Sequence, residues 1–281
     1  MQKVWPYLKL GRISNLPTVW ANVLCASLLV GGQDITTQAL LLTAASLFYT
    51  AGMYLNDYFD RAFDKEHRPS RPIPSGDVSE RSVLILSTLM TISALAICLS
   101  LSVVTFIWAF LVMVFILWYN LDHKLNKLSP FLMAGCRLWL YPMAASAYGV
   151  KIGPPLWVTG IAIYAYIVGL SYIARLGLTK SLWSCLALIS LLAPVWLRSP
   201  NFLDQPALAW AILACLLGWL ALTLSPFTKD TEKRVARLLG GIVLIDLYAL
   251  AFNDRLNLYL LLLFTVFFIL NLSLQKRIPG T

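Results

Sequence analysis

The residues best suited to chemistry are three acids within residues 56–64, which read Asn-Asp-Tyr-Phe-Asp-Arg-Ala-Phe-Asp. Asp57, Asp60 and Asp64 are spaced by three and four residues, so a continuous helix would place their carboxylates on one face. Like charges at this spacing repel one another unless a cation lies between them, and hard oxygen ligands suit Mg²⁺. We therefore predict a Mg²⁺ site formed by these three carboxylates. The alternative is a solvated helix end whose acids share no function.

A basic, proline-rich turn follows the acids. Residues 67–76 read His-Arg-Pro-Ser-Arg-Pro-Ile-Pro-Ser-Gly. The guanidinium groups of Arg68 and Arg71 can bind phosphate oxygens through two parallel hydrogen bonds, and the prolines reduce the freedom of the unbound loop. Carboxylates for a metal beside arginines for phosphate are what a Mg²⁺–diphosphate complex requires. Taken alone, such a loop could also be only a rigid connection between helices.

The composition indicates which elements must position these residues. The chain has 281 residues, of which 59% are hydrophobic and 12% charged, whereas soluble domains are about 25% charged. This excludes a water-soluble enzyme. The apolar residues form blocks of roughly 17–22 residues, long enough to cross a bilayer core of about 30 Å as helix. We predict an all-α membrane bundle of nine or ten transmembrane helices around a central cavity, in a single domain over residues 1–281.

The predicted spans are about 16–32, 38–56, 81–101, 103–121, 130–149, 155–175, 181–198, 207–224, 236–252 and 256–274. The weakest is 236–252, which carries Asp246 at its middle and could be a span, a half-helix or an interfacial helix. With ten spans and a cytoplasmic N-terminus, most of the 22 Lys and Arg fall in cytoplasmic segments, as the positive-inside rule requires. Topology and anionic lipids then explain the net charge of +9 without a nucleic-acid partner.

Several of these segments resemble the UbiA superfamily of intramembrane prenyltransferases. Residues 56–64 match its first motif, NDxxDxxxD, and residues 71–76, Arg-Pro-Ile-Pro-Ser-Gly, match the stretch that follows it. Arg12 with residues 16–22 is similar to the first helix of the family. Three further residues lie where the family has a Tyr-and-Lys segment after its fourth helix: Tyr119, Asn120 and Lys124.

The resemblance implies transfer of a prenyl group from a prenyl diphosphate to a lipophilic or cyclic acceptor, with Mg²⁺ as the cofactor. It implies that the site lies beneath cytoplasmic loops of an integral membrane protein, most simply one of a bacterial inner membrane. The residues given catalytic roles are Asn56, Asp57, Asp60 and Asp64. The residues predicted to bind diphosphate are Asn22, Arg68, Arg71, Asn120, Lys124, Arg137, Arg175 and Lys180.

Some of these assignments have alternatives. Asn22 and Asn120 could instead hydrogen-bond neighbouring helices. Arg137 lies within a span, so it needs an anionic partner or a polar cavity, and either diphosphate or Asp246 could be that partner. His67 and His123 are isolated from each other and form no transition-metal site.

The sequence departs from the family at its second acidic motif, of the DxxxD type, which is expected at the end of the sixth helix. Residues 171–180 read Ser-Tyr-Ile-Ala-Arg-Leu-Gly-Leu-Thr-Lys, and no Asp or Glu occurs between Asp122 and Asp204. This Tyr-x-x-Ala-Arg pattern is similar to that of EboC, a UbiA-like subgroup associated with a bacterial secondary-metabolite gene cluster. We predict that Arg175 or Lys180 replaces the second Mg²⁺ as a fixed positive charge. Alternatively, both residues only mark a cytoplasmic helix end.

Two other functions remain open from the sequence. A non-catalytic lipid-diphosphate binder or export component could have kept one phosphate site and lost the other. A transporter would need ionisable residues inside several spans, where only Arg137 and Asp246 qualify. The three clustered carboxylates favour the enzyme. The sequence leaves open the donor chain length, the acceptor, the number of Mg²⁺ ions and the oligomeric state.

Overall fold

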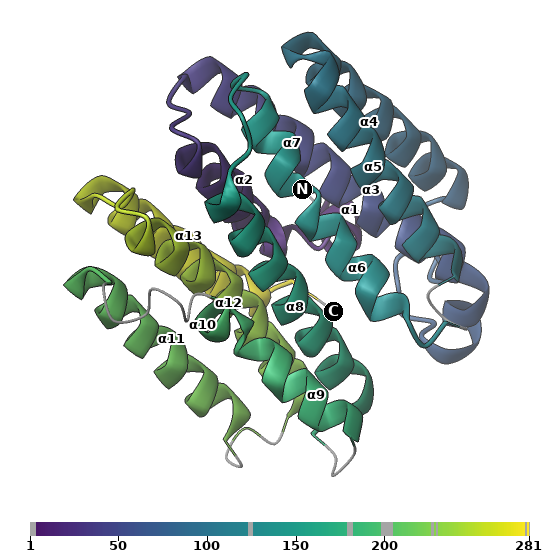
Figure 1. The fold of residues 1–281 in the computed structure, drawn as a ribbon. Coiled ribbons are helices and arrows are strands. Elements are labelled where there is room, and N and C mark those ends of the chain that lie inside the picture. Colours follow the sequence, from purple (N-terminus) through teal and green to yellow (C-terminus); the bar gives the residue numbers. More distant parts are fainter. Residues whose placement is uncertain are drawn as a thin grey trace.

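The chain folds into a bundle of helices that lie side by side (Figure 1). The computed structural model describes residues 4–122, 126–178, 182–197, 205–225, 228, 230–278 and 280. Within these ranges the regular secondary structure is entirely helical, which confirms the all-α prediction. In chain order the helices are α1 (Trp5–Leu10), a 3₁₀ helix (Ile13–Asn15), α2 (Leu16–Leu29), α3 (Ile35–His67), α4 (Glu80–Leu101), α5 (Val103–Asp122), α6 (Ser129–Leu138), α7 (Leu140–Ser146), α8 (Pro154–Leu176), α9 (Leu182–Leu191), α10 (Ala193–Trp196), α11 (Ala207–Leu224), α12 (Thr231–Phe252) and α13 (Leu258–Gln275).

Each of the ten predicted blocks contains a helix in the described ranges, but the helices differ in length. In the described ranges seven helices are long and apolar enough to cross a membrane: α3, α4, α5, α8, α11, α12 and α13. α2 has 14 residues, while the fifth block divides at Trp139 into α6 and α7 and the seventh at Leu192 into α9 and α10. A proline follows each break, Pro142 and Pro194. Proline causes such breaks because it lacks the N–H that continues the helix and clashes with the preceding turn.

The weakest predicted span is a complete helix at the centre of the bundle. α12 has 22 residues and packs against α2, α8, α11 and α13. Asp246, which made the span doubtful, is 0% exposed and lies among other helices. A half-helix and an interfacial helix were therefore both wrong alternatives for this segment.

Helix α3 carries the acidic motif and is longer than a membrane span requires. Asp34 caps its start by accepting a hydrogen bond from the backbone N–H of Thr37 at 2.7 Å, and this bond lowers the pKa of the Asp34 carboxyl. The helix ends at His67 because Pro69 disfavours helical backbone at the residue before it. Its 33 residues correspond to about 50 Å, against about 30 Å of bilayer core. The acids lie in the last turns and are thus at the end of the span, as predicted.

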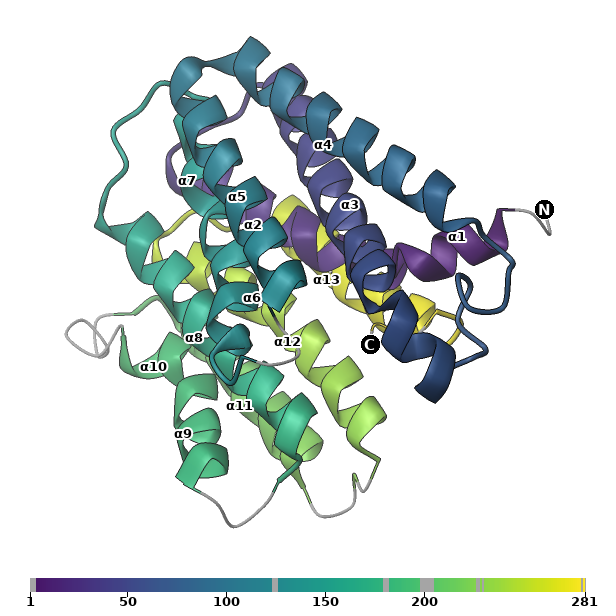
Figure 2. The ribbon, with the colours of Figure 1, turned by 90° about the vertical axis from the view of Figure 1, so that its right-hand side faces the viewer.

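The outer helices present apolar side chains away from the bundle. Figure 2 shows α3 and α4 on one side of the molecule and α9, α10 and α11 on the other. Ile92 on α4, Ile107 on α5 and Val266 on α13 are all more than half exposed. Such surfaces are stable in lipid and costly in water. The protein is accordingly an integral membrane protein.

Candidate active site

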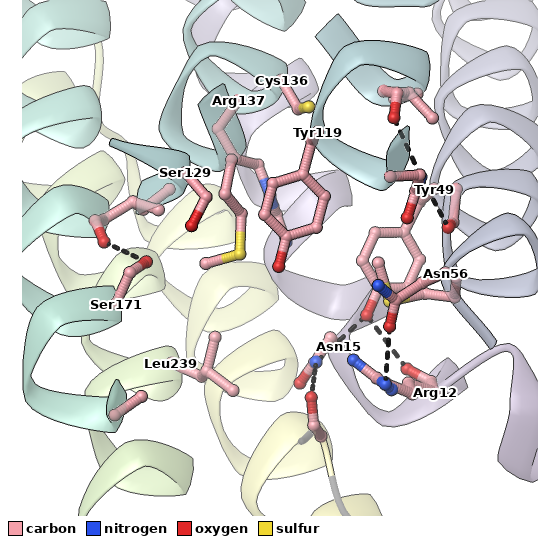
Figure 3. Close-up of a pocket in the computed structure, with 18 of the residues that line it drawn as sticks. Arg12, Asn15, Tyr49, Asn56, Tyr119, Ser129, Cys136, Arg137, Ser171 and Leu239 are labelled. Carbon is pink, nitrogen blue, oxygen red and sulfur yellow. Dashed lines mark hydrogen bonds between the residues drawn. The ribbon is translucent and has the colours of Figure 1, made fainter. Parts of the chain in front are cut away.

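A cavity of about 710 Å³ opens between the helices that carry the predicted site residues. Its walls come from α2, α3, α5, α6, α7, α8 and α12, together with the segment before α2, the turn after α3 and Gly280 near the C-terminus. Figure 3 shows polar side chains that several of these helices contribute to the lining, among them Asn56, Tyr119, Ser129 and Ser171. The rest of the wall is mostly apolar, including Val19, Phe48, Ile116, Met133, Leu170 and Ile242. The cavity is thus polar in part and otherwise suited to a hydrocarbon chain.

The structure separates the three acids of α3 into two environments. Asp60 and Asp64 line the cavity with Asn56, and all three are buried. Asp57 is also buried but is not part of the cavity wall. One oxygen of Asp57 forms ion pairs with Arg12 at 3.3 Å and with Arg71 at 3.1 Å. The continuous helix was predicted correctly. The shared role of the three acids as Mg²⁺ ligands stays a prediction, and Asp57 is in addition held by two arginines.

The turn after α3 folds back onto the acids through Arg71. The Nη1 atom of Arg71 contacts an oxygen of Asp57 and, at 2.9 Å, Oδ2 of Asp64. The loop is held by backbone hydrogen bonds from Ser75 to Arg71 and from Val78 to Pro72. Val78 is 3% exposed and packs in a small apolar cluster with Leu10 and Tyr54. The proline-rich turn is therefore ordered around the site rather than being only a connection, and Arg68 lines the cavity beside it.

Arg12 is the residue that the predicted site set omitted. Its guanidinium donates to Asn56 at 3.2 Å and to Asp57 at 3.3 Å, and it lines the cavity. Its backbone has a φ of 43°, in the left-handed region that is unfavourable for a residue with a long side chain. This conformation turns the chain from α1 into the segment that starts α2. The available signal was its place in the segment that resembles the first helix of the family.

Two of the residues on this wall suit a hard cation. Oδ1 of Asp64 is buried and has no hydrogen-bond partner, and Asp60 lines the cavity one helical turn away. No group of three His, Cys, Asp or Glu side chains within the described ranges is close enough to hold a metal by itself. Mg²⁺ is commonly bound by only one or two carboxylates, with water and substrate phosphates completing its octahedron. Asp60 and Asp64 fit that pattern, in which water and substrate phosphates supply the remaining ligands.

The opposite wall has hydroxyls and a cation where a second acidic motif was expected. Ser171 and Arg175 of α8 line the cavity with Ser129 of α6. Arg175 is exposed at the mouth, and its Nη1 donates to the backbone oxygen of Asn126 at 3.1 Å and to Ser129 at 3.3 Å. Of the described side chains that line the cavity, the carboxylates are those of two residues on α3. The described carboxylates of the lining therefore belong to α3, whereas α8 contributes a cation.

The remaining predicted diphosphate ligands have three different outcomes. Asn120 lines the cavity, its amide nitrogen donating to backbone oxygens of α3 and α5 while Oδ1 is buried without a partner. Arg137 also lines the cavity, whereas Asn22 is fully buried outside its wall. The side chain of Asn22 bonds to its neighbours, as in the alternative interpretation, and its contact with diphosphate stays a prediction. Lys124, Lys180 and His123 lie outside the described residues.

We expect the change Arg71→Lys to weaken diphosphate binding by about tenfold or more. One terminal nitrogen of Arg71 already contacts two carboxylates. Only a guanidinium has further N–H groups, in a fixed planar arrangement, that can bind a phosphate at the same time. Binding of pyrophosphate with Mg²⁺, measured by calorimetry on the purified protein, checks this. The exposed Lys65 on the same helix, changed to arginine, is the control. Unaltered pyrophosphate affinity in Arg71→Lys would limit Arg71 to a structural role.

Comparison with known proteins agrees with this geometry. The model of the UbiA prenyltransferase family matches residues 14–245. A 4-hydroxybenzoate octaprenyltransferase of Pectobacterium atrosepticum is 31% identical over 155 residues, which cover 54% of this chain and 53% of that protein. A digeranylgeranylglyceryl phosphate synthase of Haloquadratum walsbyi is 39% identical over 89 residues, 31% of each chain. The chain thus spans about half the length, or less, of the curated relatives it matches.

Solved structures share the fold. One of digeranylgeranylglyceryl phosphate synthase superposes with a TM-score of 0.67 at 20% identity, covering 91% of this chain and all of that one. A UbiA homologue from Archaeoglobus fulgidus bound to GPP and Mg²⁺ superposes with a TM-score of 0.53 at 14% identity, covering 98% of this chain and all of that one. At these identities the likeness concerns the arrangement of the helices.

Proposed function

Because the chain belongs to the UbiA prenyltransferase family, we propose that it transfers a prenyl group from a prenyl diphosphate to a lipophilic or cyclic acceptor. The observation that carries the proposal is a largely apolar cavity with buried carboxylates, Asp60 and Asp64, and the guanidinium of Arg71 at one end. The 4-hydroxybenzoate octaprenyltransferase and the GPP-bound homologue named above support this class of reaction.

Asp60 and Asp64 are the residues that would hold Mg²⁺ together with the diphosphate of the donor. When bound there, the ion neutralises charge on the departing diphosphate. The unpaired Oδ1 of Asp64 and the Mg²⁺ bound to the homologue from Archaeoglobus fulgidus support this assignment. Asp57 keeps Arg12 and Arg71 in place, and we assign it no direct contact with the ion.

The other residues of the site bind and orient the substrates. Arg68 and Arg71 contact the phosphate oxygens, and the bond between C1 of the prenyl group and the bridging oxygen breaks with its electron pair leaving on the diphosphate. Arg12 holds Asn56, whose amide hydrogen-bonds an oxygen of the diphosphate. The acceptor supplies the electron pair for the new bond and loses a proton. The apolar wall excludes water, which would otherwise capture the allylic cation.

We further propose that the mouth of the cavity faces the cytoplasm. Most Lys and Arg side chains of the predicted topology lie on the side to which the last turns of α3 extend. A bacterial inner membrane, and membership of the EboC-like subgroup, stay predictions. The test of topology is labelling of single cysteines introduced at residues 66 and 255, which are predicted to lie on opposite faces.

The proposed function predicts Mg²⁺-dependent release of pyrophosphate from a prenyl diphosphate. Purified protein is incubated with labelled geranyl, farnesyl or geranylgeranyl diphosphate and a membrane-lipid extract as the acceptor pool, with Mg²⁺ or with a chelator. We expect a prenylated lipid by mass detection and equimolar pyrophosphate only with Mg²⁺. Tight binding without any product would instead support the alternative of a non-catalytic lipid-diphosphate binder, which the missing second acidic motif favours. Neither binding nor turnover would contradict both.

A further inference from the structure

Arg137 is a cation on the cavity wall that the proposed donor site does not use. It lies on α6, lines the cavity, and its guanidinium carbon is 5.6 Å from the centre of the Tyr49 ring. Figure 3 shows Arg137 on α6 among the lining residues. A charged side chain within the membrane region is costly and normally serves a polar ligand or partner.

Arg137 faces a part of α3 that comes well before the acids, because its guanidinium lies over Tyr49. Tyr49 and Asp60 are eleven residues apart on the continuous helix α3, which is about 16 Å along its axis at about 1.5 Å per residue. In the proposed donor site, the diphosphate and its metal would be held by Asp60 and Asp64. The acceptor would then lie on the Arg137 side of the reacting carbon of the donor.

The described contacts of Arg137 are with neutral groups. Nη1 donates to Oδ1 of Asn22 at 2.7 Å, and Nη2 donates to the hydroxyl of Thr18 at 2.9 Å. A guanidinium has five N–H donors, so these two bonds do not exhaust it. Among the described residues no carboxylate is within ion-pair distance of Arg137. Its charge is therefore held in position but not neutralised by direct contact.

A fully buried carboxylate fixes the orientation of this cation through Asn22. The amide nitrogen of Asn22 donates to Oδ2 of Asp246 at 2.7 Å and to the hydroxyl of Tyr141 at 3.1 Å. Tyr141 in turn donates to the other oxygen of Asp246. Because the nitrogen of Asn22 faces these acceptors, its oxygen must face Arg137. All three supporting side chains are at most 1% exposed, so the arrangement is rigid.

We propose that Arg137 forms a subsite for an anionic group, a carboxylate or a phosphate, on the acceptor. This rests on the proposed function and names the class of acceptor that the cavity takes. A hydrocarbon chain gains nothing from a fixed guanidinium, whereas a carboxylate or phosphate is bound by it through charge-assisted hydrogen bonds. An anion at Arg137 and a diphosphate at Asp60 and Asp64 anchor the two substrates at opposite ends, with the reacting carbons between them.

The experiment measures anion preference at equilibrium, without turnover. The protein in lipid nanodiscs, saturated with Mg²⁺ and pyrophosphate, is titrated with two pairs of probes. The first pair is 4-hydroxybenzoate and its neutral methyl ester, and the second is an alkylglycerol phosphate and the neutral alkylglycerol. We expect one anionic probe to bind at least about tenfold more tightly than its neutral partner, in line with the strength of charge-assisted bonds. Which pair shows the preference distinguishes a carboxylate from a phosphate.

The variant Arg137→Gln is expected to remove that preference, as is Arg137→Met, which is measured in parallel in case one of the two fails to fold. Arg255→Gln, an exposed arginine outside the cavity wall, is the matched control and should retain the preference. An unchanged preference in a folded Arg137 variant, or no anion preference in the unmodified protein, overturns the subsite. Failure of the unmodified protein to bind Mg²⁺ and pyrophosphate would instead remove the donor site, which is read out separately.

Discussion

The change Asp60→Ala is expected to abolish Mg²⁺-dependent binding of prenyl diphosphate and to lower turnover by at least about a hundredfold. Removal of one group that stabilises charge on a leaving group costs about 10²–10³ in rate, and here the lost group also anchors the metal. Asp60 is buried and lines the cavity on the same wall as Asp64. Calorimetric titration with pyrophosphate, in the presence of Mg²⁺ and of a chelator, measures the binding, and pyrophosphate release measures the turnover.

A matched control is available on the same helix. Glu66 lies in the last turn of α3 and is exposed, so Glu66→Ala removes an acid of the same segment without touching the cavity. We expect it to bind and turn over as the unmodified protein does. If Asp60→Ala behaved like Glu66→Ala, the metal assignment on α3 would be wrong. The change Asp57→Asn gives a further comparison, since it should act by releasing Arg12 and Arg71 rather than by removing a ligand.

The sequence predicted the acidic helix well because its determinants are local. The spacing of Asp57, Asp60 and Asp64 fixes their common face once the helix continues, and Pro69 fixes where it ends. The different contacts of the three acids depend instead on partners that are distant in the chain. Arg12 reaches Asp57 across 45 positions of the chain, and spacing along one helix contains no information about such a partner.

The buried network around Arg137 illustrates the same limit. Sequence analysis could say that an arginine inside a span needs a partner, and it offered Asp246 or a diphosphate. In the structure Arg137 is linked to Asp246 indirectly, through hydrogen bonds of both residues with Asn22. The three residues lie on three helices far apart in the chain. Hydrophobic blocks identify α2, α6 and α12 as helices, but only their packing decides which of their faces meet. The roles of Asn22 and Asp57 were therefore beyond the sequence.

The second large effect is expected at Arg175, where the sequence lacks the acids of the second family motif. Arg175 lines the cavity on α8, opposite the acidic wall of α3, and is anchored by Asn126 and Ser129 at the mouth. A fixed guanidinium and a metal ion can each neutralise a leaving diphosphate. Arg175→Ala should therefore weaken pyrophosphate binding by about ten- to hundredfold, the range for hydrogen bonds to charged groups. The same titration should find one Mg²⁺ per site in the unmodified protein.

The competing explanation is that Arg175 only marks the end of a span. It predicts that Arg175→Ala binds pyrophosphate almost as tightly as the unmodified protein, and that Arg175→Lys is indistinguishable from both. Our interpretation predicts an intermediate affinity for Arg175→Lys, because the charge stays while the planar fork is lost. The control is Arg61→Ala, since Arg61 pairs with Glu80 at 2.8 Å outside the cavity wall. Two Mg²⁺ ions bound with each diphosphate would contradict the substitution outright, because the charge assigned to Arg175 would then be supplied by the second ion.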